Sequence, residues 1–184
     1  MTENRNPFRS GDTLNNPRLR ALLRYWNEKR GDKPMPARNA IDPLEIPRLL
    51  SVTLLADVVQ PYPKIRLLGT DATTAYGAET RGWTIDRFQF GHFTSAWIEA
   101  FSIVTREHIP AAAAGSYMTG AQFSLIETVL LPLSDDVGSM TYIFGGLLIT
   151  PSQQNPLTVP TESIAYVSSV SVDSAPLKSE CRGG

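Results

Sequence analysis

Apolar residues recur at helical spacing in two stretches of the chain. In the first, residues 17–30, a stripe is formed by Leu19, Leu22, Leu23 and Trp26. Asn16 is a good N-cap, a proline suits the first position that follows, and Gly31 is placed to end the helix. In the second, residues 92–108, the stripe is formed by Phe93, Trp97, Ala100, Phe101 and Val104. We therefore predict two amphipathic α-helices, of which the second is the longest of the domain.

Five runs rich in apolar and β-branched residues predict strands, at 51–60, 64–68, 111–118, 122–133 and 139–150. The first two runs are joined by a turn that contains two prolines. The last two are joined by Asp135-Asp136-Val137-Gly138, which has the residues of a hairpin corner. We expect the last three runs to form an antiparallel meander. Residues 163–172 predict either one more strand or a segment that packs across the body.

From the second predicted strand towards the long helix, the stretch of residues 65–88 is interrupted by glycines. Gly69 can take backbone angles that end a strand, and Thr70 or Asp71 can cap a helix that follows it. Gly77 is placed to stop that helix in the left-handed conformation. We therefore expect several very short helices in this segment.

The order of these elements indicates an α+β fold. The most economical arrangement is a five-stranded antiparallel sheet with helices on one face, plus an added N-terminal helix. The length of 184 residues fits one domain with added ends. We divide the chain into a flexible lead at 1–16, an N-terminal helical extension at 17–50, the sheet-containing domain at 51–150, and a C-terminal extension and disordered tail at 151–184.

Charge and composition narrow the classes of function. Apolar residues make up 42% of the chain, which is enough for a hydrophobic core, and the formal net charge is −1. A nucleic-acid-binding protein usually carries a strong basic imbalance, so nucleic acid is not an expected partner. The basic residues of the first helix indicate a solvated helix face rather than a phosphate-binding surface; they are Arg18, Arg20, Arg24, Lys29 and Arg30.

The sequence also indicates the compartment. A single cysteine, Cys181, cannot form an internal disulfide, which fits a reducing environment. No apolar run is long enough to span a membrane, and the first residues lack the apolar core of a signal peptide. We therefore predict a cytoplasmic protein with no membrane partner.

Residues that commonly carry chemistry are sparse. His92 and His108 stand at the two ends of the predicted long helix, with no second ligand cluster for a metal. Asp57 and Glu127 are isolated carboxylates in predicted strands, and neither has a partner in view for general acid–base work. The sequence contains no phosphate-binding glycine loop and no nucleophile elbow. We predict no catalytic residues, no metal and no cofactor.

Five short segments stand out by their order along the chain. They are Tyr25-Trp26, PARNAIDP at 36–43, RLLGT at 66–70, YGAETRG at 76–82 and LLPLSDDVG at 130–138. In this order they resemble a small bacterial family of PAS-like domains, whose members are typically short, stand-alone proteins of alphaproteobacteria. The resemblance extends from Leu22 to Thr150. It implies a PAS fold and a sensory or regulatory protein, and it implies no catalytic residues.

The resemblance also implies a small-molecule pocket between the sheet and its covering helices. The residues placed to line it are Arg66, Tyr76, Trp83, Trp97, Phe101, Tyr117 and Phe144. The aromatic members of this set would fill a core equally well without a ligand. Arg66 separates the two interpretations. Pointing inward, it marks an anionic ligand or a buried ion pair with Asp71, Glu79 or Glu127, and pointing outward it is a surface residue of the second strand.

We expect a sensory or regulatory module that binds a small molecule or a protein partner and does no catalysis. One alternative is a small enzyme of the α+β cone fold, in which an Asp–His pair converges in one deep cavity. A second alternative is a DNA-associated regulator that uses the first helix. The stripe of Leu19, Leu22, Leu23 and Trp26 supports two interpretations, a homodimer contact and packing onto the domain's own core.

Overall fold

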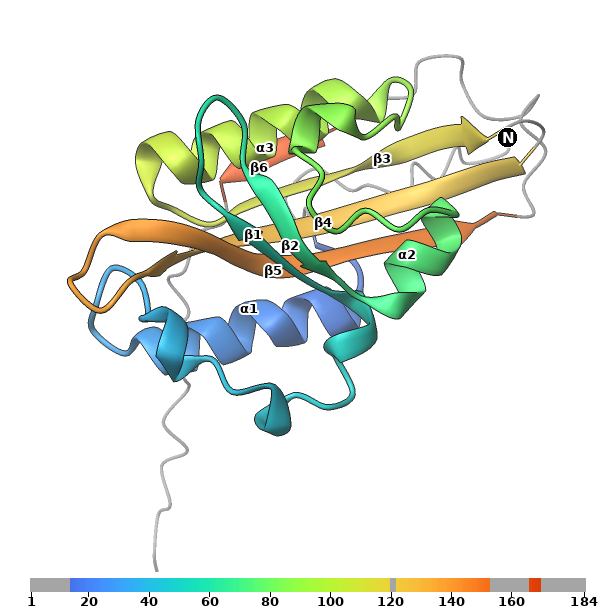
Figure 1. Ribbon diagram of the computed structural model, residues 1–184. Helices are drawn as coiled ribbons and strands as arrows, with labels where there is room; N and C mark the ends of the chain where they lie inside the picture. Colours follow the sequence, from blue (N-terminus) through green and yellow to red (C-terminus); the bar gives the residue numbers. More distant parts are fainter. Residues whose placement is uncertain (1–13, 120–121, 153–165, 170–184) are drawn as a thin grey trace, which may run out of the picture.

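The computed structural model describes residues 14–119, 122–152 and 166–169, and its centre is one antiparallel sheet (Figure 1). The strand order is β2-β1-β5-β4-β3-β6. The bounds are β1 Thr53–Asp57, β2 Lys64–Leu68, β3 Ala111–Thr119, β4 Gln122–Ser134, β5 Met140–Pro151 and β6 Tyr166–Ser169. The predicted five-stranded antiparallel sheet is confirmed in β1 to β5. The sixth strand falls within residues 163–172, where a strand was one of two interpretations.

Helices cover both faces of this sheet. The α-helices are α1 Pro17–Arg30, α2 Thr70–Tyr76 and α3 Phe93–Glu107, and short 3-10 helices are η1 Arg38–Ala40, η2 Pro43–Glu45, η3 Leu50–Val52 and η4 Ile85–Arg87. Figure 1 shows α3 on one side of the sheet and α1 on the other. The helices that follow β2 therefore cover one face, as predicted, and the added N-terminal helix covers the opposite face.

Each face of the sheet has its own hydrophobic core, because side chains alternate along a strand. On β5, Ile143 packs into the core beneath α3, and the next residue, Phe144, packs into the core beneath α1. The α3 core includes Leu54, Ile126 and Trp97, all fully buried. The sheet is thus the middle one of three layers.

α1 packs closely against the sheet. Asn16 caps the helix as predicted, since its Oδ1 accepts a hydrogen bond from the backbone N–H of Arg18 at 2.9 Å. Gly146 of β5 leaves room for two leucines of the helix. A Cβ built at this glycine would lie 2.7 Å from a methyl carbon of both Leu19 and Leu22. The absence of a side chain at Gly146 therefore lets the helix approach the strand closely.

The apolar stripe of α1 is not an exposed surface. Leu19, Leu22 and Trp26 are buried in their own chain, and Leu23 is half-buried against the same cluster. The Trp26 indole also donates from Nε1 to the carbonyl oxygen of Pro132 at 2.8 Å. This corrects the interpretation of the stripe as a dimer contact, because its apolar side chains are used by the chain's own sheet. Self-association through another surface stays a prediction.

Two polar contacts fix the first turn of α1. Glu127 of β4 accepts hydrogen bonds at Oε2 from the backbone N–H groups of Asn15 and Asn16, at 3.0 and 3.1 Å. Arg18 donates from both terminal nitrogens to Oδ2 of Asp71 on α2, each at 2.9 Å. This guanidinium holds the pKa of the Asp71 carboxyl below its usual value. The helices on the two faces of the sheet are thus linked directly.

Candidate functional site

Glycines turn the segment after β2 back over the sheet. Gly69 follows β2 where the backbone passes close to Ser51, since a Cβ at Gly69 would lie 2.3 Å from the Ser51 carbonyl oxygen. Gly69 is also the N-cap of α2, without a side-chain cap bond, so the prediction that Thr70 or Asp71 caps this helix is wrong. Gly77 ends α2 with φ 82°, in the predicted left-handed conformation. The last residue of this short helix, a tyrosine, reaches the α3 face.

A second turn presents Trp83. Gly82, with φ 84°, donates its N–H to the carbonyl oxygen of Ile65 at 2.7 Å, and Ile65 donates to the carbonyl oxygen of Trp83 at 2.8 Å. These two bonds fasten the turn along the outer edge of β2. The N–H of Trp83 also donates to the carbonyl oxygen of Thr80 at 3.0 Å, which closes the turn.

Seven aromatic rings form one contact network on the α3 face, here named the aromatic cluster: Tyr76, Trp83, Phe88, Phe90, Phe93, Trp97 and Phe101. The Trp97 ring centroid lies 4.8 Å from that of Phe101 and 5.4 Å from those of Phe88 and Phe90. Its indole Nε1 donates to the carbonyl oxygen of Ile85 at 3.1 Å. Rings at these separations are in direct contact, so Trp97 is the packed centre of the cluster.

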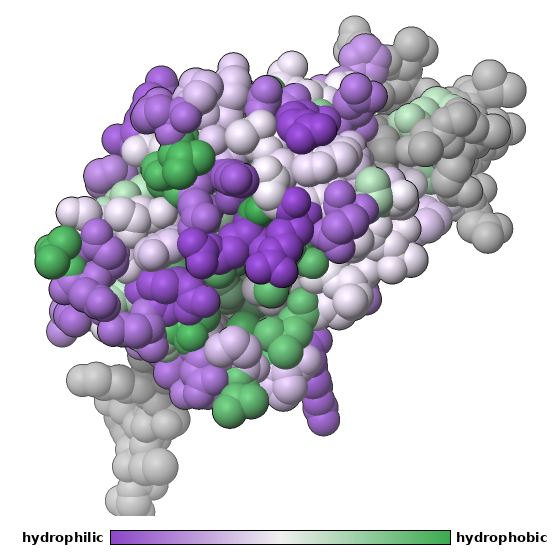
Figure 2. Space-filling view, viewed as in Figure 1, coloured by the Kyte–Doolittle hydropathy of each residue, from purple (hydrophilic) through white to green (hydrophobic). Residues whose placement is uncertain are grey.

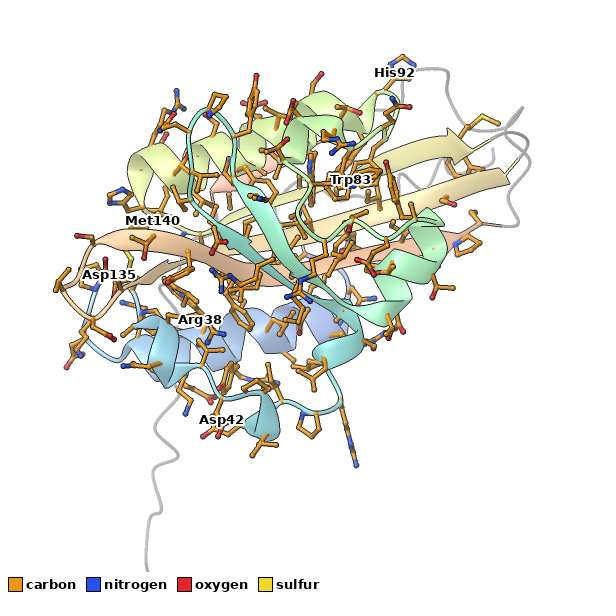
Figure 3. All side chains as sticks on the ribbon, in the orientation of Figure 1. Arg38, Asp42, Trp83, His92, Asp135 and Met140 are labelled. Carbon is orange, nitrogen blue, oxygen red and sulfur yellow. The ribbon has the colours of Figure 1, made fainter. Side chains whose placement is uncertain are left out.

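The aromatic cluster has a buried centre and a half-exposed rim. Phe88, Phe90 and Trp97 are buried, whereas Tyr76 and Trp83 are half-buried. Figure 3 shows Trp83 between α2 and the start of α3. A molecule arriving from solvent therefore meets the two rim rings before it meets the centre.

The rim rings also make polar contacts. The Tyr76 hydroxyl accepts a hydrogen bond from the backbone N–H of Gln89 at 3.1 Å. The guanidinium carbon of Arg87 lies 4.8 Å from the centre of the Trp83 ring, within cation–π range. The rim thus combines aromatic surface with a positive charge.

A buried hydroxyl lies in the same turn as Trp83. Thr80 has an exposed fraction of 0%, and its Oγ1 makes no hydrogen bond to any group in the described part of the chain. Leaving a buried polar group without a partner costs about 1–3 kcal/mol. A bound molecule with a donor or acceptor would recover that free energy only if it displaced the side chains that bury Thr80.

Four of the seven residues predicted to line a pocket meet in the aromatic cluster: Tyr76, Trp83, Trp97 and Phe101. Phe144 does not, because it faces α1, with its ring centroid 6.4 Å from that of Tyr25. Ile143 points to the α3 face of the sheet. Because side chains alternate along a strand, the next residue, Phe144, points to the α1 face. This corrects the placement of Phe144. The side chain of Tyr117 lies outside the described part of the structure.

Arg66 points to solvent, away from the aromatic cluster. Its guanidinium makes a two-point ion pair with Asp57, from Nε to Oδ1 at 2.9 Å and from Nη2 to Oδ2 at 3.1 Å, and the side chain is 54% exposed. The hydrogen bonds that Arg66 donates to Asp57 raise the pKa of the Arg66 guanidinium above its usual value. The register of β1 on β2 shifts between Leu55 and Ala56, so Arg66 stands opposite no residue of β1. The outward interpretation is correct, and the inward one is wrong.

The remaining candidate acids and bases lie apart. Asp57 is held by Arg66, and Glu127 is held by backbone N–H groups at the start of α1. His92 and His108 are exposed at opposite ends of α3, and Figure 3 shows His92 pointing away from the body. Over residues 14–119, 122–152 and 166–169, no three His, Cys, Asp or Glu side chains are grouped to hold a metal ion. These residues do not form the Asp–His pair expected of a cone-fold enzyme.

Two residues of this site escaped the sequence prediction. Phe90 lies 5.2 Å from Tyr76 and 5.4 Å from Trp97 between ring centroids, so it connects the rim to the centre. A signal for it was available, because Phe88 and Phe90 are two residues apart, the spacing that puts side chains on one side of an extended segment. Thr80 gave no such signal, since a polar residue in a glycine-containing turn is usually exposed.

The fold and this site define a class: small α+β domains in which an antiparallel sheet carries short helices and one long helix over an aromatic interior. The chain belongs to the PAS domain family, whose family model matches residues 14–148, well over half of its length. The match begins before α1 and includes it. No curated protein matches the chain. Within the described residues, no helix combines the length and the apolar character needed to cross a membrane. Membership of the PAS family indicates a sensory or regulatory module.

Proposed function

We propose that this PAS domain senses a small, largely apolar molecule that binds at the rim of the aromatic cluster, and that it does no catalysis. The molecule contacts the rings of Tyr76 and Trp83 and offers a hydrogen-bonding group to the hydroxyl of Thr80. The observation that carries the proposal is a half-exposed aromatic rim over a buried centre of rings. Small-molecule sites are typically apolar and aromatic with a few placed polar groups, which is the composition of this rim.

Binding at the rim moves rings, because the centre of the cluster is already filled. Tyr76 is the last residue of α2, and Trp97 lies in α3. A ring displaced at the rim therefore shifts one of these helices relative to the other. A ligand changes the balance between two such arrangements only by its differential affinity for them. The proposed signal is this change in the position of α2 against α3.

Native mass spectrometry of the purified full chain tests the proposal. We expect a mass above that of the bare chain, and release of a small molecule on denaturing extraction. Trp83→Ala removes the largest ring of the rim and should weaken retention about tenfold, which corresponds to about 1.4 kcal/mol. Trp26→Phe is the matched control, because this indole lies on the other face and should leave retention unchanged.

The refuting result has two parts. One is a bare mass for the wild type. The other is the absence of any rise in melting temperature when the protein is screened against apolar compounds that carry a donor or acceptor. Ligand binding stabilises the folded state by mass action, so a true ligand must raise the melting temperature.

A protein-docking module is the second candidate. Leu50 and Leu67 have exposed fractions of 40% and 47%, which is high for leucine. Figure 2 shows apolar side chains gathered in the lower half of the visible face. Complementation in cells that lack the chain separates the candidates. Failure of Trp83→Ala with success of a Leu50→Ser/Leu67→Ser variant supports ligand binding, and the reverse supports docking.

A further inference from the structure

β6 extends the sheet along the outer side of β3. Tyr166–Ser169 pair antiparallel with the first four residues of β3, in a register that sets Ala111 opposite Ser169 and Ala114 opposite Tyr166. β3 has nine residues, and within the described part of the chain β6 pairs with four of them. The backbone of β3 therefore accepts a strand in a defined register, and the C-terminal part of the same chain supplies it.

Beneath β6, the sequence of β3 has none of the features that usually protect an edge strand. Proteins protect such edges with charged side chains, proline, bulges or covering segments, because unpaired backbone groups recruit other strands. β3 reads AAAAGSYMT, with no charge and no proline, and it pairs with β4 without a shift of register. The opposite edge, β2, carries Lys64 and Arg66, a shifted register and the hydrogen-bonded turn at Gly82. β2 is thus closed to a further strand, whereas β3 is suited to receive one.

The connection between β5 and β6 is long enough to permit exchange. The N–H of Ser152 donates to the carbonyl oxygen of Phe123, which is level with Met118 of β3. From there to Tyr166 the chain must cross three strand spacings of ~4.8 Å and move four residues of ~3.3 Å along β3, a gap of ~20 Å. The thirteen intervening residues, 153–165, can span at most ~46 Å. Because the connection can span more than this gap, its length does not force β6 to pair with β3 of its own chain.

We propose that the outer edge of β3 is a self-association site, where residues 166–169 of one copy pair with Ala111–Ala114 of a second copy, and reciprocally. The exchanged strand makes the same backbone hydrogen bonds in the same register, so the dimer requires no new contact surface. A link of this length gives an effective concentration on the order of millimolar. The closed monomer prevails in dilute solution, and the exchanged dimer grows as the protein concentration approaches that range.

Single-cysteine variants measure the exchange. On a Cys181→Ser background, Ala112→Cys and Ser168→Cys occupy opposed positions of β3 and β6. In a mixture of these two variants, a disulfide between them can only join different chains. We expect a covalent dimer on non-reducing gels, with a yield that rises roughly in proportion to protein concentration below the millimolar range. Ala113→Cys with Val167→Cys repeats the test, because adjacent pairs of an antiparallel ladder alternate in separation.

Two controls make the result decisive. The same-chain variant Ala112→Cys/Ser168→Cys should form an internal disulfide in dilute solution and stay monomeric. If neither this variant nor Ala113→Cys/Val167→Cys forms an internal disulfide, β6 does not pair with β3 in this register. A mixture of His92→Cys with Ser168→Cys measures random collision, since His92 is exposed and stands opposite no residue of β6. The proposal is overturned if neither mixture of opposed cysteine variants forms more interchain disulfide than the His92→Cys mixture does.

Discussion

Two neighbouring glycines of β5 test how α1 is seated, because an added methyl group meets a different obstacle at each. At Gly146, a Cβ would lie 2.7 Å from methyl carbons of Leu19 and Leu22. At Gly145, it would lie 1.9 Å from the carbonyl oxygen of Val129. The leucine methyls can shift by rotation, whereas the Val129 carbonyl is part of the ladder between β4 and β5.

The two substitutions should therefore differ in cost. Overpacking a core costs about 1–3 kcal/mol, and alanine in place of glycine recovers about 0.5–1 kcal/mol of backbone entropy. Gly146→Ala should thus lower the free energy of unfolding by about 1 kcal/mol. Gly145→Ala should lower it by about 3 kcal/mol or more, because the methyl–oxygen distance must grow from 1.9 Å past 3.0 Å, which opens the ladder.

Urea unfolding followed by far-ultraviolet circular dichroism measures both losses. Leu22→Ala tests whether contact with α1 causes the loss at Gly146, since it removes one of the methyl groups that the new Cβ would contact. Combined with Gly146→Ala it should relieve part of the cost, and combined with Gly145→Ala it should not. Equal losses for the two glycine variants, or no coupling between Gly146 and Leu22, would show that α1 does not sit on β5 in this way.

Three further changes test other contacts. Asp71→Asn should lower stability at pH 7 by less than about 1 kcal/mol, because the side chains of Arg18 and Asp71 are 34% and 45% exposed. Arg18 depresses the pKa of Asp71 below its ordinary 3.8, so this stabilisation is present above that pH and is lost as pH falls through the depressed pKa; the stability curves of wild type and variant should converge there. Trp26→Phe deprives the Pro132 carbonyl of its indole donor and should cost about 1–3 kcal/mol in the urea assay. Trp97→Ala should cost about 3–5 kcal/mol, and a loss below about 1 kcal/mol would contradict its place at the packed centre of the cluster.

Local signals in the chain predicted the elements better than the surfaces on which they meet. The first helix was predictable because Asn16 and the apolar stripe act within a few residues of each other. The partner of that stripe was not, because an apolar stripe looks the same whether it packs on its own sheet or on a second copy. The sheet itself followed from the order of strands and turns, which leaves few antiparallel arrangements.

In the candidate site, too, contacts within one element were predictable and contacts between elements were not. Trp97 and Phe101 share one helical stripe, so their meeting on the sheet was predictable from spacing. Phe144 was assigned to the wrong face because the two glycines that follow it interrupt the alternation of large apolar residues along β5. The position of Arg66 in the sheet depends on a shift of register between β1 and β2. Such a shift involves both strands, so the sequence of either strand alone does not predict it.

The layered arrangement also makes the chain its own optical probe. Its three tryptophans are divided by the sheet, with Trp26 in the core beneath α1 and with Trp83 and Trp97 on the side of α3. The tryptophan emission of a Trp26→Phe variant comes only from the α3 side, and that of a Trp83→Phe/Trp97→Phe variant comes only from the α1 side. Loosening of one layer can thus be recorded separately from loosening of the other, by intrinsic fluorescence and without an attached dye.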